Sequence, residues 1–210
     1  MHHGEMGTAR ERYLQALDLF SAEARAGADR LGLPSGCEDW SIADVIKHVA
    51  SVQAEHGGRA LLGGSLSTAT AGPLHRDITT DEGDFEAVER WEQLATQLRT
   101  AAHAADEEAF ASLPLATLDM ALHSWDIRWG AAHVGLAGNL EFPLSLLEWM
   151  EDYRERAPEE AIRMPGIFMP PVDPPSGATR SERFAAWTGR DPRTGCQPRG
   201  DSIPAPTDAS

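Results

Sequence analysis

Residues 118–130 read LDMALHSWDIRWG, and this stretch decides the class of fold. Large apolar residues recur in it at steps of three and four, which is the period of a helix with one buried face. The same period includes a leucine just before the stretch. The positions that we expect to be buried are Leu115, Leu118, Leu122, Trp125 and Trp129. The sequence therefore predicts a long helix in the core of a helical protein.

Two polar residues, Asp119 and His123, stand four positions apart inside this apolar pattern. Residues four apart on a helix project to neighbouring positions, so the carboxylate and the imidazole can reach a single point. This geometry suits two ligands of one metal ion, and it also suits a buried hydrogen-bonded pair. A catalytic zinc ion typically takes three protein ligands, and His48 is the candidate for the third.

The composition of the chain argues against a nucleic-acid-binding, a membrane-bound or a disulfide-rich protein. The 210 residues carry 18 basic and 33 acidic side chains, a formal net charge of −15, which repels phosphate backbones and anionic membranes. No apolar run approaches the roughly 18 residues of a membrane helix, and the first residues lack the apolar core of a signal peptide. Cys37 and Cys196 are too few and too far apart for a disulfide framework or a cysteine metal cluster. We expect a cytoplasmic monomer or homodimer without nucleic-acid or membrane partners.

Further amphipathic segments predict the remaining helices. The segments that keep a helical period are residues 8–31, residues 42 onward, residues 84–105 and residues 143–157. Ser41 followed by Asp44 has the form of a capping box, which marks the start of the second helix. Pro114 suits the first position of the helix described above. No segment alternates with period two, so we expect an all-α fold, most simply a four-helix bundle with added helices.

The chain changes character after the last of these helices. Prolines prevent regular structure over residues 164–175. The segment 158–193 is therefore expected to form an extended strap on the bundle of residues 1–157, with one short helix over residues 181–187. Residues 194–210 carry Pro, Gly and Ser with little to bury, and we expect a disordered tail there.

His48 lies on the second helix, three positions after Val45 and four before Val52, so it borders the predicted core. A metal ligand fits this position, and so does a histidine whose nitrogens are satisfied by a neighbouring group. His56 and Arg59 follow on the same segment. They fit either a pocket rim that recognises an anionic substrate or a solvent-facing surface.

Asp126 lies three positions after His123 on the same helical face. It fits a group that orients the imidazole N–H of a metal ligand, and equally an ion-pair partner of Arg128 or Arg190. Core packing is expected for three tryptophans, with a place in the wall of the substrate pocket as the alternative for one of them: Trp40, Trp125 and Trp129.

Three stretches of the sequence together resemble one protein family. They read GCEDWSIADVIKHV (residues 36–49), DMALHSWD (residues 119–126) and RFAAWTGRDP (residues 183–192). They resemble the DinB-like metal-binding proteins of the mycothiol-dependent maleylpyruvate isomerase type, an actinobacterial group, and the resemblance spans residues 8–193. It implies a DinB-like four-helix bundle that holds a divalent metal. The implied ligands are a histidine of the first stretch, with an acidic residue and a histidine four positions apart in the second.

On this chain the implied metal ligands are His48, Asp119 and His123. The isomerase carries glutamate at the position of Asp119, so the shorter side chain must bring the metal nearer the helix or bind it through one oxygen. Nitrogen and oxygen ligands of this kind favour Zn²⁺, and Ni²⁺, Fe²⁺, Mn²⁺ and Co²⁺ fit the same set. A single carboxylate leaves the site with a net positive charge, which attracts an anion.

The resemblance further implies that mycothiol, or a similar low-molecular-weight thiol, is the co-substrate, and a metal-bound thiol loses its proton at neutral pH. The expected activity is S-transfer to, or isomerisation of, an electrophilic small molecule, with the three ligands as the catalytic residues. Two other functions fit the same sequence. One is a thiol-independent Lewis-acid tailoring enzyme of specialised metabolism, and the other is a metal-binding protein without turnover.

Overall fold

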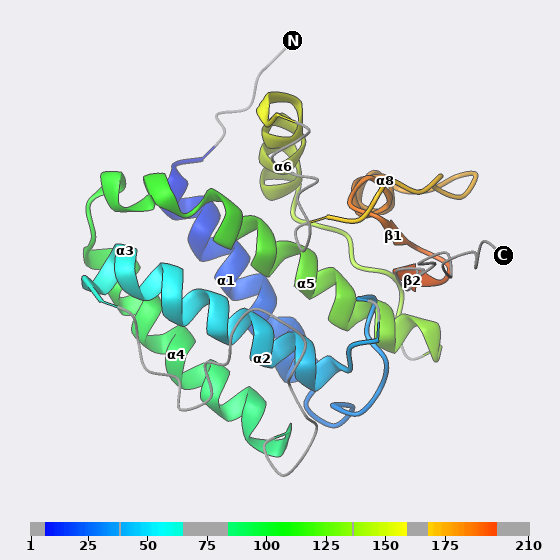
Figure 1. Cartoon of the computed structure of the whole chain (residues 1–210), viewed down its shortest axis with the longest axis horizontal. Helices are drawn as coiled ribbons and strands as arrows, with labels where there is room; N and C mark the ends of the chain where they lie inside the picture. Colours follow the sequence, from blue (N-terminus) through cyan, green and yellow to red (C-terminus); the bar gives the residue numbers. More distant parts are fainter. Residues whose placement is uncertain (1–6, 38, 65–83, 136, 159–167, 197–210) are drawn as a thin grey trace, which may run out of the picture.

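The computed structural model describes residues 7–37, 39–64, 84–135, 137–158 and 168–196. Its regular structure is almost entirely helical (Figure 1), which confirms the predicted all-α class. The helices are α1 (Ala9–Ala26), α2 (Ile42–Val52), the π-helix η1 (Gln53–Gly57), α3 (Gly58–Leu62), α4 (Asp84–Ala104), the 3₁₀-helix η2 (Glu107–Ser112), α5 (Pro114–His133), α6 (Leu144–Arg156) and α8 (Arg180–Trp187). Two short strands, β1 (Arg190–Asp191) and β2 (Gly195–Cys196), pair antiparallel. Among the described helices, none combines the length and the apolar character needed to cross a lipid bilayer.

Polar side chains start three of the helices in the same way. At α2 the backbone N–H of Ser41 donates to Asp44 Oδ2 (3.0 Å), and the backbone N–H of Asp44 donates to Ser41 Oγ (3.2 Å), which confirms the predicted capping box. The same pair of hydrogen bonds begins α1 at Thr8 and α8 at Thr179. Pro114 is the first residue of α5, where its missing N–H leaves no helical hydrogen bond unmade. These local signals fix where the helices begin.

Helix α1 ends at Ala26, earlier than the predicted residue 31. A Cβ atom on the next residue, Gly27, would lie 3.1 Å from the side chain of Ile42 and 3.2 Å from that of Ile127. Helices α2 and α5 therefore crowd the chain at this point. The chain then continues in turns, in which the backbone N–H groups of Ala28 and Arg30 donate to the carbonyls three residues before them, and it leads to the start of α2.

The segment that follows His48 stays helical past the glycine pair at positions 57 and 58. Helix α2 passes directly into η1 and then into α3, and both glycines are buried. A Cβ atom on Gly57 would lie 2.8 Å from the Tyr13 hydroxyl and 3.0 Å from the side chain of Leu98. The glycine therefore permits close packing against α1 and α4 and does not end the helical segment.

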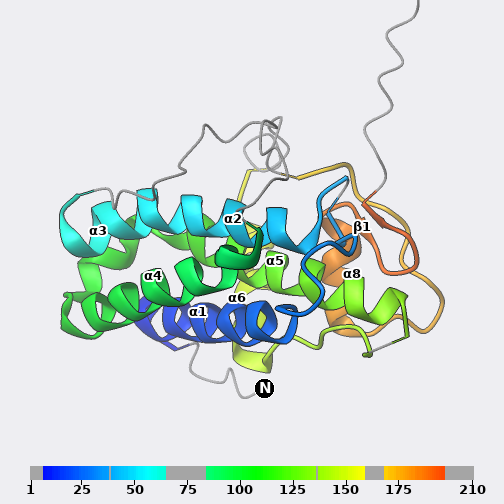
Figure 2. The same cartoon turned by 90° about the horizontal axis from the view of Figure 1, so that it is seen from below.

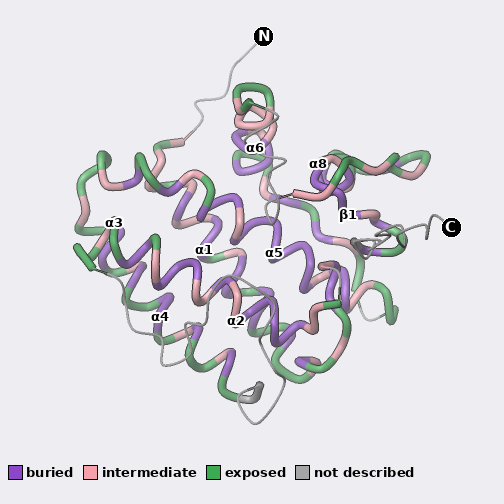
Figure 3. The backbone as a smooth tube through the Cα atoms, in the orientation of Figure 1, coloured by how far each residue is buried: buried purple, intermediate pink, exposed green. Residues whose placement is uncertain are grey.

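Helices α1, α2, α4 and α5 pack around one core. Helices α1 and α2 each contact both α4 and α5, and Figures 1 and 2 show the four running roughly side by side. Buried residues alternate with more exposed ones along α1, α2 and α4, whereas α5 is buried along most of its length (Figure 3). The core contains large side chains that are fully buried, among them Trp91, Trp125, Tyr13, Phe20 and Phe110.

Helix α5 is buried on most of its sides, not on one face as predicted. Its buried residues include the polar Thr117, Ser124 and Asp126, whereas Leu115, which was expected in the core, is 48% exposed. The reason is the central position of the helix, because α1 and α2 pack against it and the C-terminal segment covers its end. A helix that is covered on several sides does not need a single apolar face.

The C-terminal segment folds back onto the last turns of α5 (Figure 1). Residues 168–175 have no regular structure, as the prolines predict, and α8 is the predicted short helix. The hairpin of β1 and β2 follows, and the indole N–H of Trp129 donates to the Pro192 carbonyl (3.1 Å). Strand β2 occupies residues 195–196, within the segment that was expected to be a disordered tail. The rest of the predicted strap and tail, residues 159–167 and 197–210, lies outside the described ranges.

Candidate metal centre

The structure brings His48, Asp119 and His123 together between α2 and α5. The Nε2 atom of His48 lies 3.3 Å from Asp119 Oδ1, and the Nε2 atom of His123 lies 3.4 Å from the same oxygen. One potential ligand atom from each residue lies within 4.8 Å of the other two. The three residues therefore meet at one point, as their spacing and the family resemblance imply.

The helices themselves place these side chains. Asp119 and His123 stand one turn apart on α5, so the helix fixes their relative position. His48 belongs to α2, whose buried face includes Val45 and Val49. Because α2 packs against α5, this apolar face brings the imidazole of His48 up to the carboxylate.

The donor set fits a divalent cation of the zinc type. Two imidazole nitrogens and one carboxylate oxygen are ligands that Zn²⁺ and neighbouring transition metals accept. Within the described residues, Oδ2 of Asp119 is buried and has no hydrogen-bond partner. A buried oxygen without a hydrogen-bond partner destabilises the folded protein unless a bound ligand contacts it. The second oxygen of Asp119 therefore supports a cation at this point.

The charged groups of the centre strongly affect one another's protonation. Burial alone would raise the pKa of Asp119, but the neighbouring His123 and His48 hold it well below its usual range. Burial alone would lower the pKa of His123, but Asp119 and Asp126 raise it to about 9. The carboxylate of Asp119 is therefore ionised at neutral pH, and a cation that binds to His123 must displace a proton.

Asp126 is connected to the centre through the second nitrogen of His123. The Nδ1–H of His123 donates to Asp126 Oδ2 (2.8 Å), and Arg190 donates to both oxygens of Asp126 (2.8 Å each). Burial alone would raise the pKa of Asp126, but Arg190 and His123 hold it below its usual value. Asp126 therefore contacts both of the partners considered for it, namely the imidazole of His123 and, as an ion-pair partner, Arg190. Arg128 pairs instead with Glu23 on α1.

Trp40 forms one wall of the centre. Its ring centroid lies 4.8 Å from that of His48 and 5.9 Å from that of His123, and its plane is within 18° of the His123 ring. The side chain is half-buried. Trp125 and Trp129 are buried in the core, as expected. Of these three tryptophans, Trp40 is the one in contact with the candidate ligands.

Cys37, which the sequence argument set aside, also lies beside the centre. Its sulfur, a nitrogen of His123 and an oxygen of Asp126 lie within 4.8 Å of one another. Arg190, however, already donates to both oxygens of Asp126, and its positive charge disfavours a cation at that position. The group that suits a cation is therefore the one around Asp119.

Two residues that were considered for a pocket rim lie on the surface. His56 is exposed on η1, and Arg59 is exposed on α3, where it forms an ion pair with Glu55. Neither belongs to the groups of potential metal ligands found among the described residues. The second possibility considered for them, a solvent-facing surface, is the one that the structure shows.

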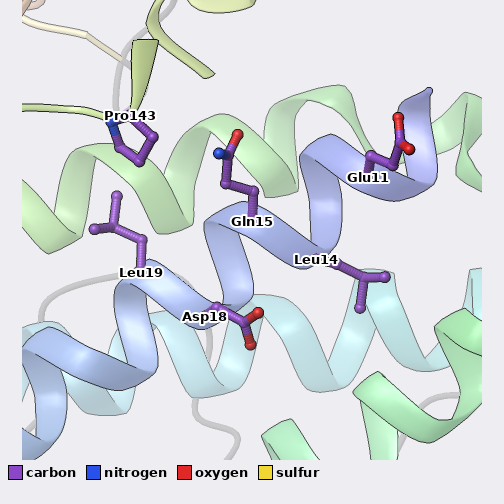
Figure 4. Close-up of a pocket in the computed structure, with 6 residues that line it drawn as sticks. All are labelled: Glu11, Leu14, Gln15, Asp18, Leu19 and Pro143. Carbon is purple, nitrogen blue, oxygen red and sulfur yellow. The ribbon is translucent and has the colours of Figure 1, made fainter. Parts of the chain in front are cut away.

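An open groove lies between α1 and the start of α6 (Figure 4). It is lined by Glu11, Leu14, Gln15, Asp18, Leu19 and Pro143. None of the candidate metal ligands contributes to this lining. The groove is therefore separate from the metal centre.

Comparisons of the chain with protein-family models, with curated proteins and with solved structures found no match. The function of this protein therefore has to follow from the geometry of the centre and from the resemblance of its sequence.

Proposed function

We propose that the protein is a divalent-metal-dependent enzyme with a DinB-like four-helix bundle, and that it activates a low-molecular-weight thiol for S-transfer to, or isomerisation of, an electrophilic small molecule. The observation that carries this proposal is the convergence of His48, Asp119 and His123 on one point between α2 and α5. The packing of α1, α2, α4 and α5 around one core supports the bundle. The thiol, with mycothiol as the reference, comes from the resemblance of the sequence.

A divalent ion bound here, with Zn²⁺ as the first choice, would lower the pKa of a thiol or a water and so supply a nucleophile at neutral pH. The protein holds the ligands in place for this chemistry. Asp119 contributes the single negative charge of the ligand set, so the site favours an anionic substrate group. Asp126 accepts the Nδ1–H of His123, which leaves Nε2 of that ring directed at His48 and Asp119.

The unequal exposure of the ligands gives the centre an accessible side. The side chains of His48 and Asp119 are 15% and 22% exposed, whereas that of His123 is 8% exposed. A small molecule would therefore reach the centre from the side of His48 and Asp119. The half-buried indole of Trp40 packs against His48 and would offer a flat apolar surface to such a molecule.

The number of ligands favours an enzyme over a metal-binding protein without turnover. Structural zinc sites normally have four protein ligands, whereas catalytic sites have three and leave one position for the substrate. Among the described residues, the group around Asp119 consists of three. A thiol-independent Lewis-acid enzyme would use the same three residues, so experiment must separate it from the thiol enzyme.

The test measures the metal content of the purified protein and then the loss of a generic electrophile, a chlorodinitrobenzene, in the presence of mycothiol. We expect about one metal ion per chain and a reaction that requires both the thiol and His48. His48→Ala should lose the metal and the reaction. His56→Ala is the matched control, because His56 is exposed on the neighbouring η1 and should be dispensable.

Each alternative has a distinct result. Thiol consumption that is unchanged in His48→Ala would rule out the thiol enzyme. Stoichiometric metal without thiol-dependent reaction would favour the Lewis-acid enzyme or the binding protein. A wild-type protein that holds no metal, even after incubation with Zn²⁺, would remove the proposal as a whole.

A further inference from the structure

We propose that Arg190 is a positioning residue of the metal centre. From the C-terminal hairpin it fixes the carboxylate of Asp126, which in turn holds His123 with Nε2 toward Asp119. The inference rests on the proposed metal centre and extends it to a part of the chain that the sequence suggested to be only a strap. It predicts that the hairpin determines how tightly the centre binds a cation.

The contacts form a continuous chain from the hairpin to the ligand. Arg190 Nε donates to Asp126 Oδ1 and Arg190 Nη2 donates to Asp126 Oδ2, both at 2.8 Å. Asp126 Oδ2 also accepts from His123 Nδ1 at 2.8 Å. The side chains of Asp126 and Arg190 are 0% and 7% exposed. Two parallel hydrogen bonds to a buried guanidinium leave the carboxylate no freedom to turn.

The fixed carboxylate sets the state of the imidazole. When His123 is neutral, its one proton stays on Nδ1 because Asp126 accepts it there, so the lone pair is on Nε2. Nε2 is the atom that lies 3.4 Å from Asp119 Oδ1. Without Arg190, the carboxylate would lose the two hydrogen bonds from the guanidinium and could rotate away from the ring, so the ligand would lose its orientation.

The loop before α2 also contacts Asp126. The backbone N–H of Gly36 donates to the Asp126 carbonyl (2.9 Å), and a Cβ atom on Gly36 would lie 2.9 Å from Asp126 Oδ1. On the hairpin side, Thr188 Oγ1 accepts a hydrogen bond from Arg190 Nη1 (3.3 Å). Arg190 and Asp126 are therefore enclosed by both the loop before α2 and the C-terminal segment.

Stability alone is a weak reason for this buried pair. Apolar residues of similar volume generally stabilise a core as well as a buried ion pair does, because both charges must be removed from water. A pair that touches the candidate ligand His123 has the additional effect of orienting it. The position of the pair, one hydrogen bond from the centre, therefore points to a role in metal binding.

The experiment measures Zn²⁺ affinity for the full chain by competition with a chelating indicator. Arg190→Gln and Asp126→Asn should each lose about 10- to 100-fold in affinity, as is typical when a group that orients a ligand is removed. Because Arg190 acts through Asp126, the double variant should bind Zn²⁺ no more than about threefold more weakly than Asp126→Asn alone. Arg193→Gln is the matched control, since Arg193 is on the same hairpin but pairs with Asp191 at the surface.

A second readout separates orientation from general loosening of the fold. In the Co²⁺-loaded protein, the visible absorption bands report the ligand geometry, and they should shift in Arg190→Gln but not in Arg193→Gln. Arg190→Lys keeps the charge without the paired hydrogen bonds, so its affinity should fall between those of the wild type and Arg190→Gln. If Arg190→Gln does not fold, as judged by circular dichroism, Arg190→Lys carries the test.

The results that would overturn the inference are equally specific. Zn²⁺ affinity within about twofold of wild type in the folded Arg190 variant, or losses that multiply in the double variant, would show that Arg190 does not act through Asp126. If His48→Ala loses Zn²⁺ while the Arg190 variants do not, only this inference fails. If the wild type itself binds no Zn²⁺, both the inference and the proposed function fail.

Discussion

The Nε2 atom of His48 lies 3.3 Å from Oδ1 of Asp119, although 71 positions separate the two residues in the sequence. This contact joins α2 to α5 through polar side chains. A second imidazole, that of His123, lies 3.4 Å from the same oxygen. Asp119 therefore lies between two imidazoles, and the charge on its side chain determines whether the centre can hold a cation.

Replacing Asp119 by asparagine keeps the shape of the side chain and removes its charge. We expect Asp119→Asn to lose more than the roughly 10- to 100-fold in Zn²⁺ affinity that is typical of groups outside the ligand set. Asp119→Glu is the matched variant, because it restores the carboxylate and matches the glutamate of the isomerase that the sequence resembles. It should regain most of the affinity. Equal Zn²⁺ affinity in wild type and Asp119→Asn would show that Asp119 is not a ligand.

The stability of the metal-free protein should depend on pH through His123. Its pKa is raised from the usual 6.5 to about 9 by Asp119 and Asp126, against the effect of burial. The stabilisation from this group is therefore complete below about pH 6.5 and is lost as the pH rises through 9. The free energy of unfolding should fall by on the order of 3 kcal/mol over this range, since each pKa unit corresponds to about 1.4 kcal/mol.

The measurement is urea denaturation of the metal-free protein at a series of pH values, with His123→Gln as the control. The alkaline loss should be absent from the variant, and identical pH profiles for the two proteins would contradict the assignment. At acidic pH the two carboxylates have the opposite effect, because the free energy of unfolding falls as the pH falls. The pKa values of Asp119 and Asp126 are held low, so their contribution is lost as the pH falls below the usual carboxyl range.

A close backbone approach makes Gly130 sensitive to substitution. A Cβ atom at this position of α5 would lie 2.4 Å from the Pro34 carbonyl oxygen, and the backbone has to move to relieve this contact. Gly130→Ala should therefore lower the free energy of unfolding by about 1–3 kcal/mol, as is typical of an overpacked core. Gly32→Ala is the control, because its Cβ atom would meet nothing within 4 Å. Equal stability of the two variants in urea would contradict the close approach.

Local signals in the sequence were sufficient for the class of fold, for the main helices and for the closeness of Asp119 to His123. The helical period predicted where the helices lie, and the Ser41 capping box predicted where α2 begins. Both signals depend on residues three or four positions apart. The convergence of Asp119 and His123 follows from their spacing on one helix. Adding His48 required the packing of α2 on α5, which the resemblance implied and the structure shows.

The features that the sequence could not provide depend on contacts between distant segments. Arg190 and Asp126 are 64 positions apart, and a strand of two residues such as β2 has no period to detect. The close packing of Gly27 against Ile42 and Ile127, next to the end of α1, exists only once α2 and α5 are in place. For Cys37, the sequence offered one signal, namely its position inside the first of the stretches that resemble the family.

Trp40 should report binding at the centre through its fluorescence. Its ring packs against the imidazoles of both His48 and His123, and a cation that binds there replaces the proton of His123 and orders both rings. Addition of Zn²⁺ should therefore change the tryptophan emission of the wild type, and Trp40→Phe should remove most of this change while retaining Zn²⁺ binding. Trp187→Phe is the matched control, because that half-buried indole packs against Phe184 on α8. An undiminished response in Trp40→Phe would contradict cation binding at the centre beside Trp40.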